Sequence, residues 1–353
     1  MSVGRVASCP AHRLGRRAAL LGTLSLAACA HQPAKSAAKS APPPRYSGRL
    51  HDYVPAAGLR WLVRGCPAKL AESQSFRPAL DLLLTPSRLR AVAQTTGFAL
   101  EKLPRGLIAG FDLGTLYLAE LGESATVARA RFTARQIHEP TKRSPDPNIV
   151  VLSGLSEGIP LGLVTIDDRV VAYGVGDPML CRAVEAYARG KLKAKSAFHG
   201  AALQGVELDT DDAWIAVHVP GPFEPRWQNA AGGLLSIATA LSARLTPTTA
   251  EHALLELTVH GDFVGTNAAE RLRSTYMSVA SSSTGTALGL GAALDARTVT
   301  NMQNDRVVLK VPLPITEIAR GMRAVTIGDF ADIFRLPTLG APSTAPTSSP
   351  EFR

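Results

Sequence analysis

Several stretches of the chain alternate apolar and polar residues, which is the pattern of a strand with one buried face. In residues 127–135, Arg and Thr alternate with Ala and Phe, and this predicts a half-exposed strand. The same alternation runs through residues 253–260 and 307–311. Within residues 165–175, two apolar runs flank Asp167-Asp168, which predicts a hairpin that turns at these aspartates.

Three helices are predicted from their end signals. Residues 85–97 begin with Thr-Pro and end at a glycine, and residues 177–190 begin with Asp-Pro and end at a glycine. Asn267 and Glu270 have the spacing of a capping box, which predicts a helix over residues 268–279.

Antiparallel strands with segregated helices predict an α+β fold, with antiparallel sheets and helices packed on one face. Trp61 and Trp214 both lie in short apolar strands that are followed by a proline, a helical stretch and further strands. This shared order suggests a duplicated β-α-β-β unit, although the same order is common in unrelated folds. The two α+β halves would be residues 50–205 and 206–337, in one folding unit or in two.

The segment from Arg16 to Cys29 is basic at its start, continues in an apolar run of about nine residues, and ends in small residues before a cysteine. That run is too short to span a bilayer. Leu26-Ala27-Ala28-Cys29 resembles the lipobox of bacterial lipoproteins. The resemblance implies that residues 1–28 are a signal peptide, and that acylated Cys29 holds the protein to a membrane. Two or more acyl chains make such an attachment stable.

The resemblance also implies a location. Ala30, rather than Asp, follows the cysteine, and in the family this favours transport to an outer membrane over retention at the inner one, with the body in the periplasm. Arg16-Arg17 leaves twin-arginine export open, but the residues that follow match that signal loosely, so general secretion is favoured. The alternative for the whole segment is a chance Leu-x-x-Cys in a cytosolic amphipathic helix.

The formal charge of +9 is concentrated before the predicted body. Residues 1–49 hold eight of the 38 Lys and Arg and none of the 29 acidic residues, so the remainder is nearly neutral. A nucleic-acid-binding protein needs a basic patch on its folded surface. The charge distribution therefore argues against a nucleic-acid partner.

Two polar segments flank the predicted body. Residues 29–49 comprise the lipidated cysteine and a segment rich in Ala, Pro, Lys and Ser, which predicts a disordered tether. Its residues 30–48 reach about 60 Å when extended and about 25 Å as a coil. Residues 338–353 are rich in Pro, Ser, Thr and Ala and predict a disordered tail.

Two of the four cysteines remain in the predicted body, because Cys9 leaves with the signal peptide and Cys29 carries lipid. In an oxidising compartment, Cys66 and Cys181 are predicted to form a disulfide, with two buried thiols as the alternative. Closing so long a loop would stabilise the fold by about 4–5 kcal/mol in the chain-entropy model. The chain has no Cys-x-x-Cys, which leaves a zinc or redox role without support.

His252, Glu256 and His260 have the spacing of a metal site on a helix. The apolar alternation around them predicts a strand instead. Successive members of the set would then lie about 13–14 Å apart, too far to share one ion. The sequence therefore predicts no metal site here.

The remaining motifs each lack a required part. Asp209-Thr-Asp211-Asp212 lacks the glycine and glutamate of a calcium loop and is predicted to be a polar turn. Ser36-x-x-Lys39 lies in the tether. Gly285, Gly289 and Gly291 do not follow a predicted strand, so they do not indicate a nucleotide-binding loop. His199 and His218 could act as bases, but no Gly-x-Ser-x-Gly elbow accompanies them. His218 is predicted to be a strand histidine on the face of Trp214.

Two functions remain. The first is a non-enzymatic envelope lipoprotein, a binding or scaffolding module for an envelope protein or an apolar small-molecule ligand, with no cofactor or metal. The chain resembles bacterial envelope lipoproteins of unknown function with duplicated α+β ectodomains. The alternative is an anchored periplasmic hydrolase whose catalytic residues are dispersed in the sequence. Its site would bring together His199 or His218, one of Asp209, Asp211 and Asp212, and a hydroxyl group.

Overall fold

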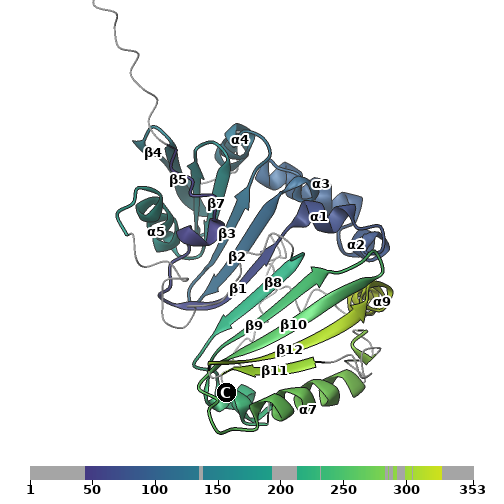
Figure 1. The fold of residues 1–353 in the computed structure, drawn as a ribbon. Helices are drawn as coiled ribbons and strands as arrows, with labels where there is room; N and C mark the ends of the chain where they lie inside the picture. Colours follow the sequence, from purple (N-terminus) through teal and green to yellow (C-terminus); the bar gives the residue numbers. More distant parts are fainter. Residues whose placement is uncertain are drawn as a thin grey trace, which may run out of the picture. The chain divides into compact units, whose positions relative to one another are not determined.

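The computed structural model describes residues 44–134, 138–192, 213–230, 232–282, 285, 289–291, 299–303 and 305–327. These residues belong to one compact unit, built on a 12-stranded sheet whose paired strands are antiparallel (Figure 1). The predicted α+β class is confirmed. Across the sheet the strands are β11 (Val299–Gln303), β12 (Arg306–Pro314), β10 (His252–Gly261), β9 (Ala238–Pro247), β8 (Ile215–Pro220), β1 (Leu59–Gly65), β2 (Arg105–Phe111), β3 (Thr115–Glu120), β7 (Val170–Val175), β6 (Ile159–Ile166), β5 (Ile149–Ser156) and β4 (His138–Asp146).

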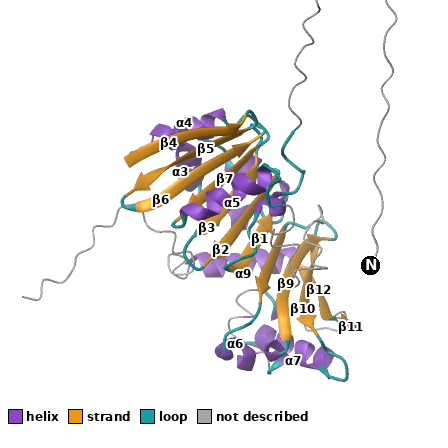
Figure 2. Ribbon diagram, turned by 90° about the vertical axis from the view of Figure 1, so that its left-hand side faces the viewer, coloured by secondary structure: helices purple, strands orange, loops and turns teal. Residues whose placement is uncertain are grey.

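Helices follow strands at both ends of the strands (Figure 2). Below, an edge of the sheet means the row of strand ends on one side, not an outermost strand. The α-helices are α1 (Pro67–Glu72), α2 (Arg77–Leu83), α3 (Pro86–Thr96), α4 (Thr126–Ala134), α5 (Pro178–Ala188), α6 (Pro225–Ala230), α7 (Ala268–Ser281) and α9 (Ile315–Ile327). Short 3-10 helices are η1 (Leu50–Tyr53), η2 (Leu100–Lys102) and η5 (Leu234–Ser236).

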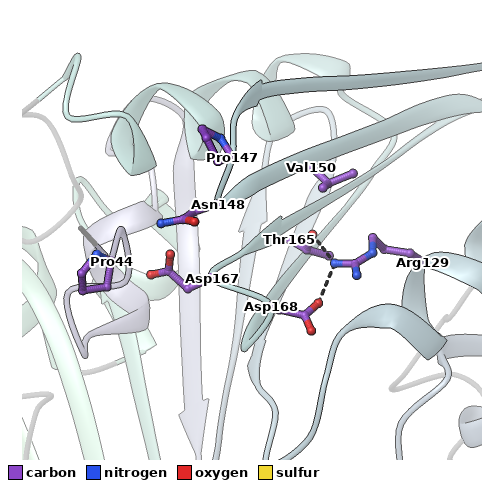
Figure 3. A pocket seen from close by; sticks show the side chains of 8 residues that line it. All are labelled: Pro44, Arg129, Pro147, Asn148, Val150, Thr165, Asp167 and Asp168. Atoms are coloured by element: carbon purple, nitrogen blue, oxygen red, sulfur yellow. Dashed lines mark hydrogen bonds and ion pairs between the residues drawn. The ribbon is translucent and has the colours of Figure 1, made fainter. Parts of the chain in front are cut away.

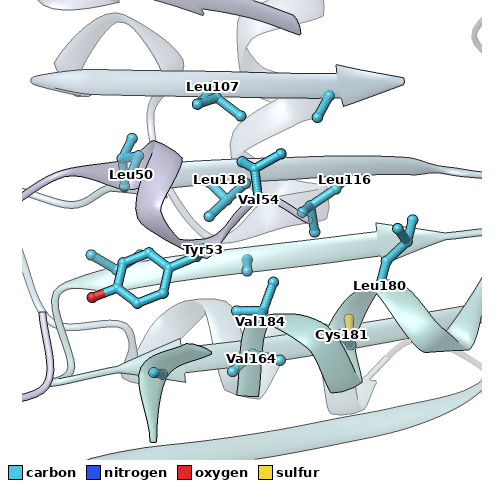
Figure 4. Close-up of a cluster of buried hydrophobic side chains, with 14 of the residues drawn as sticks. Leu50, Tyr53, Val54, Leu107, Leu116, Leu118, Val164, Leu180, Cys181 and Val184 are labelled. Atoms are coloured by element: carbon cyan, nitrogen blue, oxygen red, sulfur yellow. The ribbon is translucent and has the colours of Figure 1, made fainter. Parts of the chain in front are cut away.

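Helices cover both faces of the sheet, so the prediction of helices on one face was wrong. In β5, Val151 belongs to the cluster under α5 and η1, whereas its neighbour Leu152 belongs to the cluster under α4. Successive strand residues point to opposite faces. Figure 4 shows Leu180, Cys181 and Val184 of α5 among the buried side chains of the first cluster.

In the other half of the sheet, the two faces differ in chemistry. On β12, Val307, Leu309 and Val311 are fully buried in the cluster that includes α7. The opposite face of strands β8 to β12 carries polar side chains, including His218 and Glu256. A half-sheet that is apolar on one face and polar on the other explains the alternation in the sequence of β10 and β12.

Most predicted elements are confirmed. The 165–175 hairpin turns at Asp167 and Asp168, whose positive φ angles of 50° and 56° suit a tight two-residue turn. The helix after Thr85 is α3, which ends at left-handed Gly97, and Asp177 caps α5 by accepting from the Met179 N–H at 2.8 Å. The two alternating runs are β10 and β12.

Two predictions of local structure were wrong. Residues 127–135 were predicted as a strand, but Thr126–Ala134 form α4. Its buried residues, Ala128 and Phe132, are four apart, which is a helical spacing, and Ala and Arg favour helix. At the start of α7, Asn267 makes no side-chain capping bond, so the predicted capping box is not formed although the helix is.

The two predicted halves share one sheet, because β1 and β8 pair with each other at residues such as Leu62 with His218. A small cluster of Phe76, Leu80, Trp214, Ala253 and Ile315 also joins elements of both halves. The described residues of the predicted halves therefore lie in one continuous structure. The duplicated β-α-β-β unit stays a prediction.

Candidate functional site

The chain joins the body at a charged edge of the sheet, beside the β6–β7 turn. The Asp167 carboxylate accepts hydrogen bonds from the backbone N–H groups of Arg45 and Tyr46, each at 2.5 Å. The Arg45 guanidinium donates to Asp146 at 2.7 Å, in the neighbouring β4–β5 turn. Arg45 and Tyr46 are therefore fixed to the body by these bonds, although they fall within the predicted tether of residues 29–49.

Glu120, at the end of β3, is the buried centre of the same edge. It accepts a bond from the Tyr46 hydroxyl at 2.9 Å and from the Arg105 guanidinium at 2.8 Å, and Arg169 adds a third contact at 3.3 Å. Burial, together with the bond to Glu120, raises the pKa of Tyr46 well above its ordinary value. The phenol therefore stays protonated and remains a donor to the carboxylate.

A cavity of about 400 Å³ opens beside this junction, and Figure 3 shows the side chains that line it. Arg129 of α4 donates to Asp168 at 2.7 Å and to Thr165 at 3.2 Å, so it is already paired. A second cavity, of about 480 Å³, shares Asp167 and Asp168 with the first. Both cavities are wide open to solvent, so either would cover only part of a small molecule. The first cavity is lined by Pro44, Arg129, Pro147, Asn148, Val150, Thr165, Asp167 and Asp168.

The polar face of the other half-sheet brings two histidines to one hydroxyl. Ser242 Oγ lies 2.8 Å from His218 Nδ1 and 3.4 Å from His260 Nε2. His218 is fully buried, and its Nε2 has no hydrogen-bond partner among the described residues. Burial, with a smaller effect of His260, lowers the pKa of His218 to about 3. Burial also lowers the pKa of His260, so both rings are neutral near pH 7.

His218 was a sequence candidate, but Ser242 and the proximity of His260 were missed. The register of β8, β9 and β10 creates this arrangement, and no short motif encodes it. The other members of the predicted hydrolase site, His199, Asp209, Asp211 and Asp212, lie outside the described residues.

The strand prediction for His252, Glu256 and His260 is confirmed, because all three lie on β10. The Glu256 carboxylate pairs with Arg244 and Lys310 on the two neighbouring strands, each at 3.2 Å. In the described part of the chain, no three His, Cys, Asp or Glu side chains are placed to hold a metal ion.

Cys66 and Cys181 are both buried as free thiols, which goes against the predicted disulfide. Cys66 precedes α1, and its N–H donates to the Trp214 carbonyl. Cys181 lies on α5, where its sulfur fits against Gly162 and Gly174 of the sheet. Burial raises the pKa of Cys181 to about 11, so this thiol is unreactive near neutral pH.

Other sequence candidates are placed as follows. Cys29, Ser36 and Lys39 lie outside the described residues. The glycines at 285, 289 and 291 come after α7, which agrees with the prediction that they do not follow a strand. Within the described ranges, the helices are too short or too polar to cross a membrane.

Comparison with known proteins shows no family. No family model matches the chain, and no curated protein matches it. Crystal form III of the treponemal protein TP0453 covers 82% of this chain and 100% of its own, at 7% identity and a TM-score of 0.43. Crystal form I covers 82% and 99%, at 8% identity and a TM-score of 0.41. Likenesses this weak carry no argument about fold or function.

Proposed function

We propose that this protein is a membrane-anchored envelope lipoprotein that acts as a non-enzymatic binding or scaffolding module. The observation that carries the proposal is the segment from Arg16 to Cys29, with its basic start, short apolar run and Leu-Ala-Ala-Cys end. The structure supports it at the other end of the tether, because the chain is fixed to the body from Arg45 onward.

The same proposal includes a location. Acyl chains such as palmitate on Cys29 hold the protein to the envelope, with Ala30 favouring the outer membrane and the body in the periplasm. The 14 residues between Cys29 and Pro44 extend to about 50 Å. This length is enough to hold the body clear of the headgroups.

Replacing the acylated cysteine tests the anchor. In cells, Cys29→Ala should move the protein from the membrane fraction to the soluble fraction, because the thiol that receives the lipid is gone. Cys9→Ala is the matched control, since Cys9 lies in the predicted signal peptide and should leave the membrane association unchanged. Membrane association that survives Cys29→Ala would refute the anchor.

The binding role is supported by the two adjoining cavities at the junction of tether and body. A ligand there would contact Asp167 and Asp168, which also organise the turn that holds the chain. Native mass spectrometry on exported Cys29→Ala protein should show a mass that is lost on denaturation if the protein carries a small molecule. A bare mass would instead favour an envelope protein as the partner, to be sought by crosslinking in cells.

The hydrolase alternative is favoured by one observation, the Ser242 hydroxyl between two neutral histidines. The lowered pKa of His218 argues against it, because such a ring is a weak base near neutral pH. A fluorophosphonate probe should leave the protein unlabelled. Labelling that is lost in Ser242→Ala and kept in Ser236→Ala would establish a serine hydrolase and overturn the non-enzymatic proposal.

A further inference from the structure

Most of the exposed large apolar side chains of the described residues lie near one edge of the sheet. The register places the beginnings of β1, β3, β6, β9 and β12 at this edge, with the ends of β2, β5, β7, β8 and β10. In Figure 1, the beginning of β1 and the ends of β2 and β8 lie at the left-hand side of the sheet. We call this the apolar edge, defined by Trp61, Leu113, Ile159, Met179, Trp227, Ile237 and Val264.

In the N-terminal half, three turns of the apolar edge are in direct contact. The Gly176 N–H donates to the Pro160 carbonyl, next to Ile159. A side chain at Gly176 would meet the Leu113 carbonyl at 2.6 Å, so these turns pack without space between them. Leu113 is 78% exposed and Met179 is 57% exposed. Three apolar side chains therefore project from adjoining turns and stay exposed among the described residues.

The C-terminal half adds a second group on the same edge. A side chain at Gly261 would meet the Ile237 carbonyl at 2.7 Å and the Phe263 ring at 3.1 Å, so the segments before β9 and after β10 touch. Ile237 and Val264 are exposed there, and Trp227 of α6 is 53% exposed. Isolated apolar residues on a surface are ordinary, but seven of the eleven exposed large apolar residues described lie near this one edge.

The opposite edge has different chemistry. It carries the ion pairs of Glu120, Asp146 and Asp168, and the chain joins the body there at Asp167. Four of the exposed large apolar residues described lie elsewhere: Leu82 on α2 and Val127 on α4, which follow strands at that edge, Leu192 after α5, and Val279 near the end of α7. The apolar edge also carries ion pairs, Arg60 with Asp112 and Arg306 with Asp305, so the two edges differ in their exposed apolar side chains rather than in charge.

The length of the tether allows the bilayer to be the occupant of the apolar edge. From Cys29 to Pro44 the chain extends to about 50 Å. The distance from the β6–β7 turn back to Ile159 is one strand of eight residues, about 26 Å. The tether is thus long enough for the apolar edge to reach the bilayer that holds the lipid. Exposed Trp with Leu, Met and Ile is also the composition of surfaces that lie in the headgroup region.

We propose that the apolar edge lies on the lipid bilayer, as a second membrane contact beside the acylated Cys29. This inference rests on the proposed anchor, which keeps the edge at a high local concentration near the bilayer. A weak partition of the edge is then sufficient, because linked contacts reinforce each other. The tether and the edge together fix the orientation of the sheet, with the edge that carries Glu120 and Asp167 turned away from the membrane.

Tryptophan fluorescence tests this contact, because the chain has three tryptophans and two of them lie on the apolar edge. The lipidated protein is reconstituted into vesicles of phosphatidylethanolamine and phosphatidylglycerol, with and without brominated acyl chains. Brominated lipid should quench Trp61 and Trp227, and this quenching should fall in Trp61→Phe and in Trp227→Phe. Buried Trp214 should supply the unquenched remainder.

Matched surface variants complete the test. Leu113→Ser with Met179→Ser should weaken the bilayer contact by roughly tenfold per side chain and reduce quenching. Leu82→Ser with Val127→Ser removes two exposed apolar side chains away from the apolar edge, although less surface in total, and should leave quenching unchanged. The proposal would be overturned if both pairs of substitutions reduced quenching equally. It would also be overturned if brominated lipid did not quench the tryptophans of the wild-type protein. Self-association that only the Leu113 and Met179 pair abolishes would assign the edge to a second copy and overturn it too.

The anchor and the edge fail separately. Mass spectrometry of the reconstituted protein shows whether Cys29 carries lipid. Lipidated protein with unquenched tryptophans refutes the edge and leaves the anchor intact. Protein without lipid refutes the anchor, and flotation of that protein with the same vesicles then decides the edge, since binding that is lost in Leu113→Ser supports it and no binding overturns it.

Discussion

At the residue scale, His218 shows what a strand pattern can and cannot predict. Its place on a strand followed from the alternation around it. Its complete burial depends on the pairing of β8 with β1 and on the neighbours that this pairing brings. The sequence favoured a histidine with its bonds satisfied, but only Nδ1 has a partner among the described residues.

Burial of His218 should make the protein sensitive to acid. Its pKa is lowered from 6.5 to about 3 in the folded state, so below pH 6.5 the unfolded state binds the extra proton. Stability should therefore fall as pH drops from 6.5 toward 3, by about 1.4 kcal/mol per pH unit within that window. Urea unfolding of His218→Gln at several pH values should give a shallower pH dependence than wild type.

His138→Gln is the matched control for the acid sensitivity. The His138 side chain is exposed, so folding changes its surroundings little and its replacement should keep the wild-type slope. An unchanged slope in His218→Gln would show that other groups produce the acid sensitivity.

The two cysteines give a second prediction at the residue scale. Because Cys66 and Cys181 are buried as free thiols, a maleimide should label neither in the folded, exported protein with Cys29 replaced by Ala. Both should be labelled after unfolding without reductant. Unfolded protein that stays unlabelled until it is reduced would restore the disulfide that the oxidising compartment predicted.

At the element scale, the sequence predicted elements whose ends carry their own chemistry. Gly97 and Asp177 mark helix ends because a left-handed residue and a capping carboxylate are local requirements. Helix α4 was missed because its Arg and Ala residues alternate as they would in a strand. Which of its residues are buried depends on how the helix packs against β5 and β6. The cavity beside Arg129 was therefore also out of reach of sequence reasoning.

The β6–β7 turn should control the segment that joins tether and body. Asp167→Ala removes the acceptor of the Arg45 and Tyr46 N–H groups and should reduce stability by about 1–3 kcal/mol. Hydrogen exchange at these two amides should become faster. Glu157→Ala is the control, because Glu157 also has a positive φ, 52°, in a hairpin turn. Equal effects of the two changes would mean that turn strain, rather than lost bonds, weakens the protein.

At the scale of the whole molecule, the pairing of β1 with β8 could not be predicted. These strands are separated by about 150 residues in the sequence. The order of the strands depends on which strands still lack a hydrogen-bonded neighbour after the local hairpins have formed. A single sequence does not encode that choice in a motif. The α+β class followed from composition and alternation, but the joining of both halves in one sheet did not.

This joint predicts cooperative unfolding of the whole body. Phe76 packs edge-to-face on Trp214, with ring centroids 4.8 Å apart, and their cluster reaches Ala253 and Ile315. Urea denaturation followed by tryptophan fluorescence, circular dichroism and labelling of Cys181 should therefore give coincident transitions. Phe76→Ala should lower all three midpoints together, at a cost of about 3–5 kcal/mol. Exposed Leu82→Ala on α2 should change them by less than about 0.5 kcal/mol. If Cys181 kept its wild-type midpoint in Phe76→Ala while fluorescence shifted, the two halves would unfold separately despite their shared sheet.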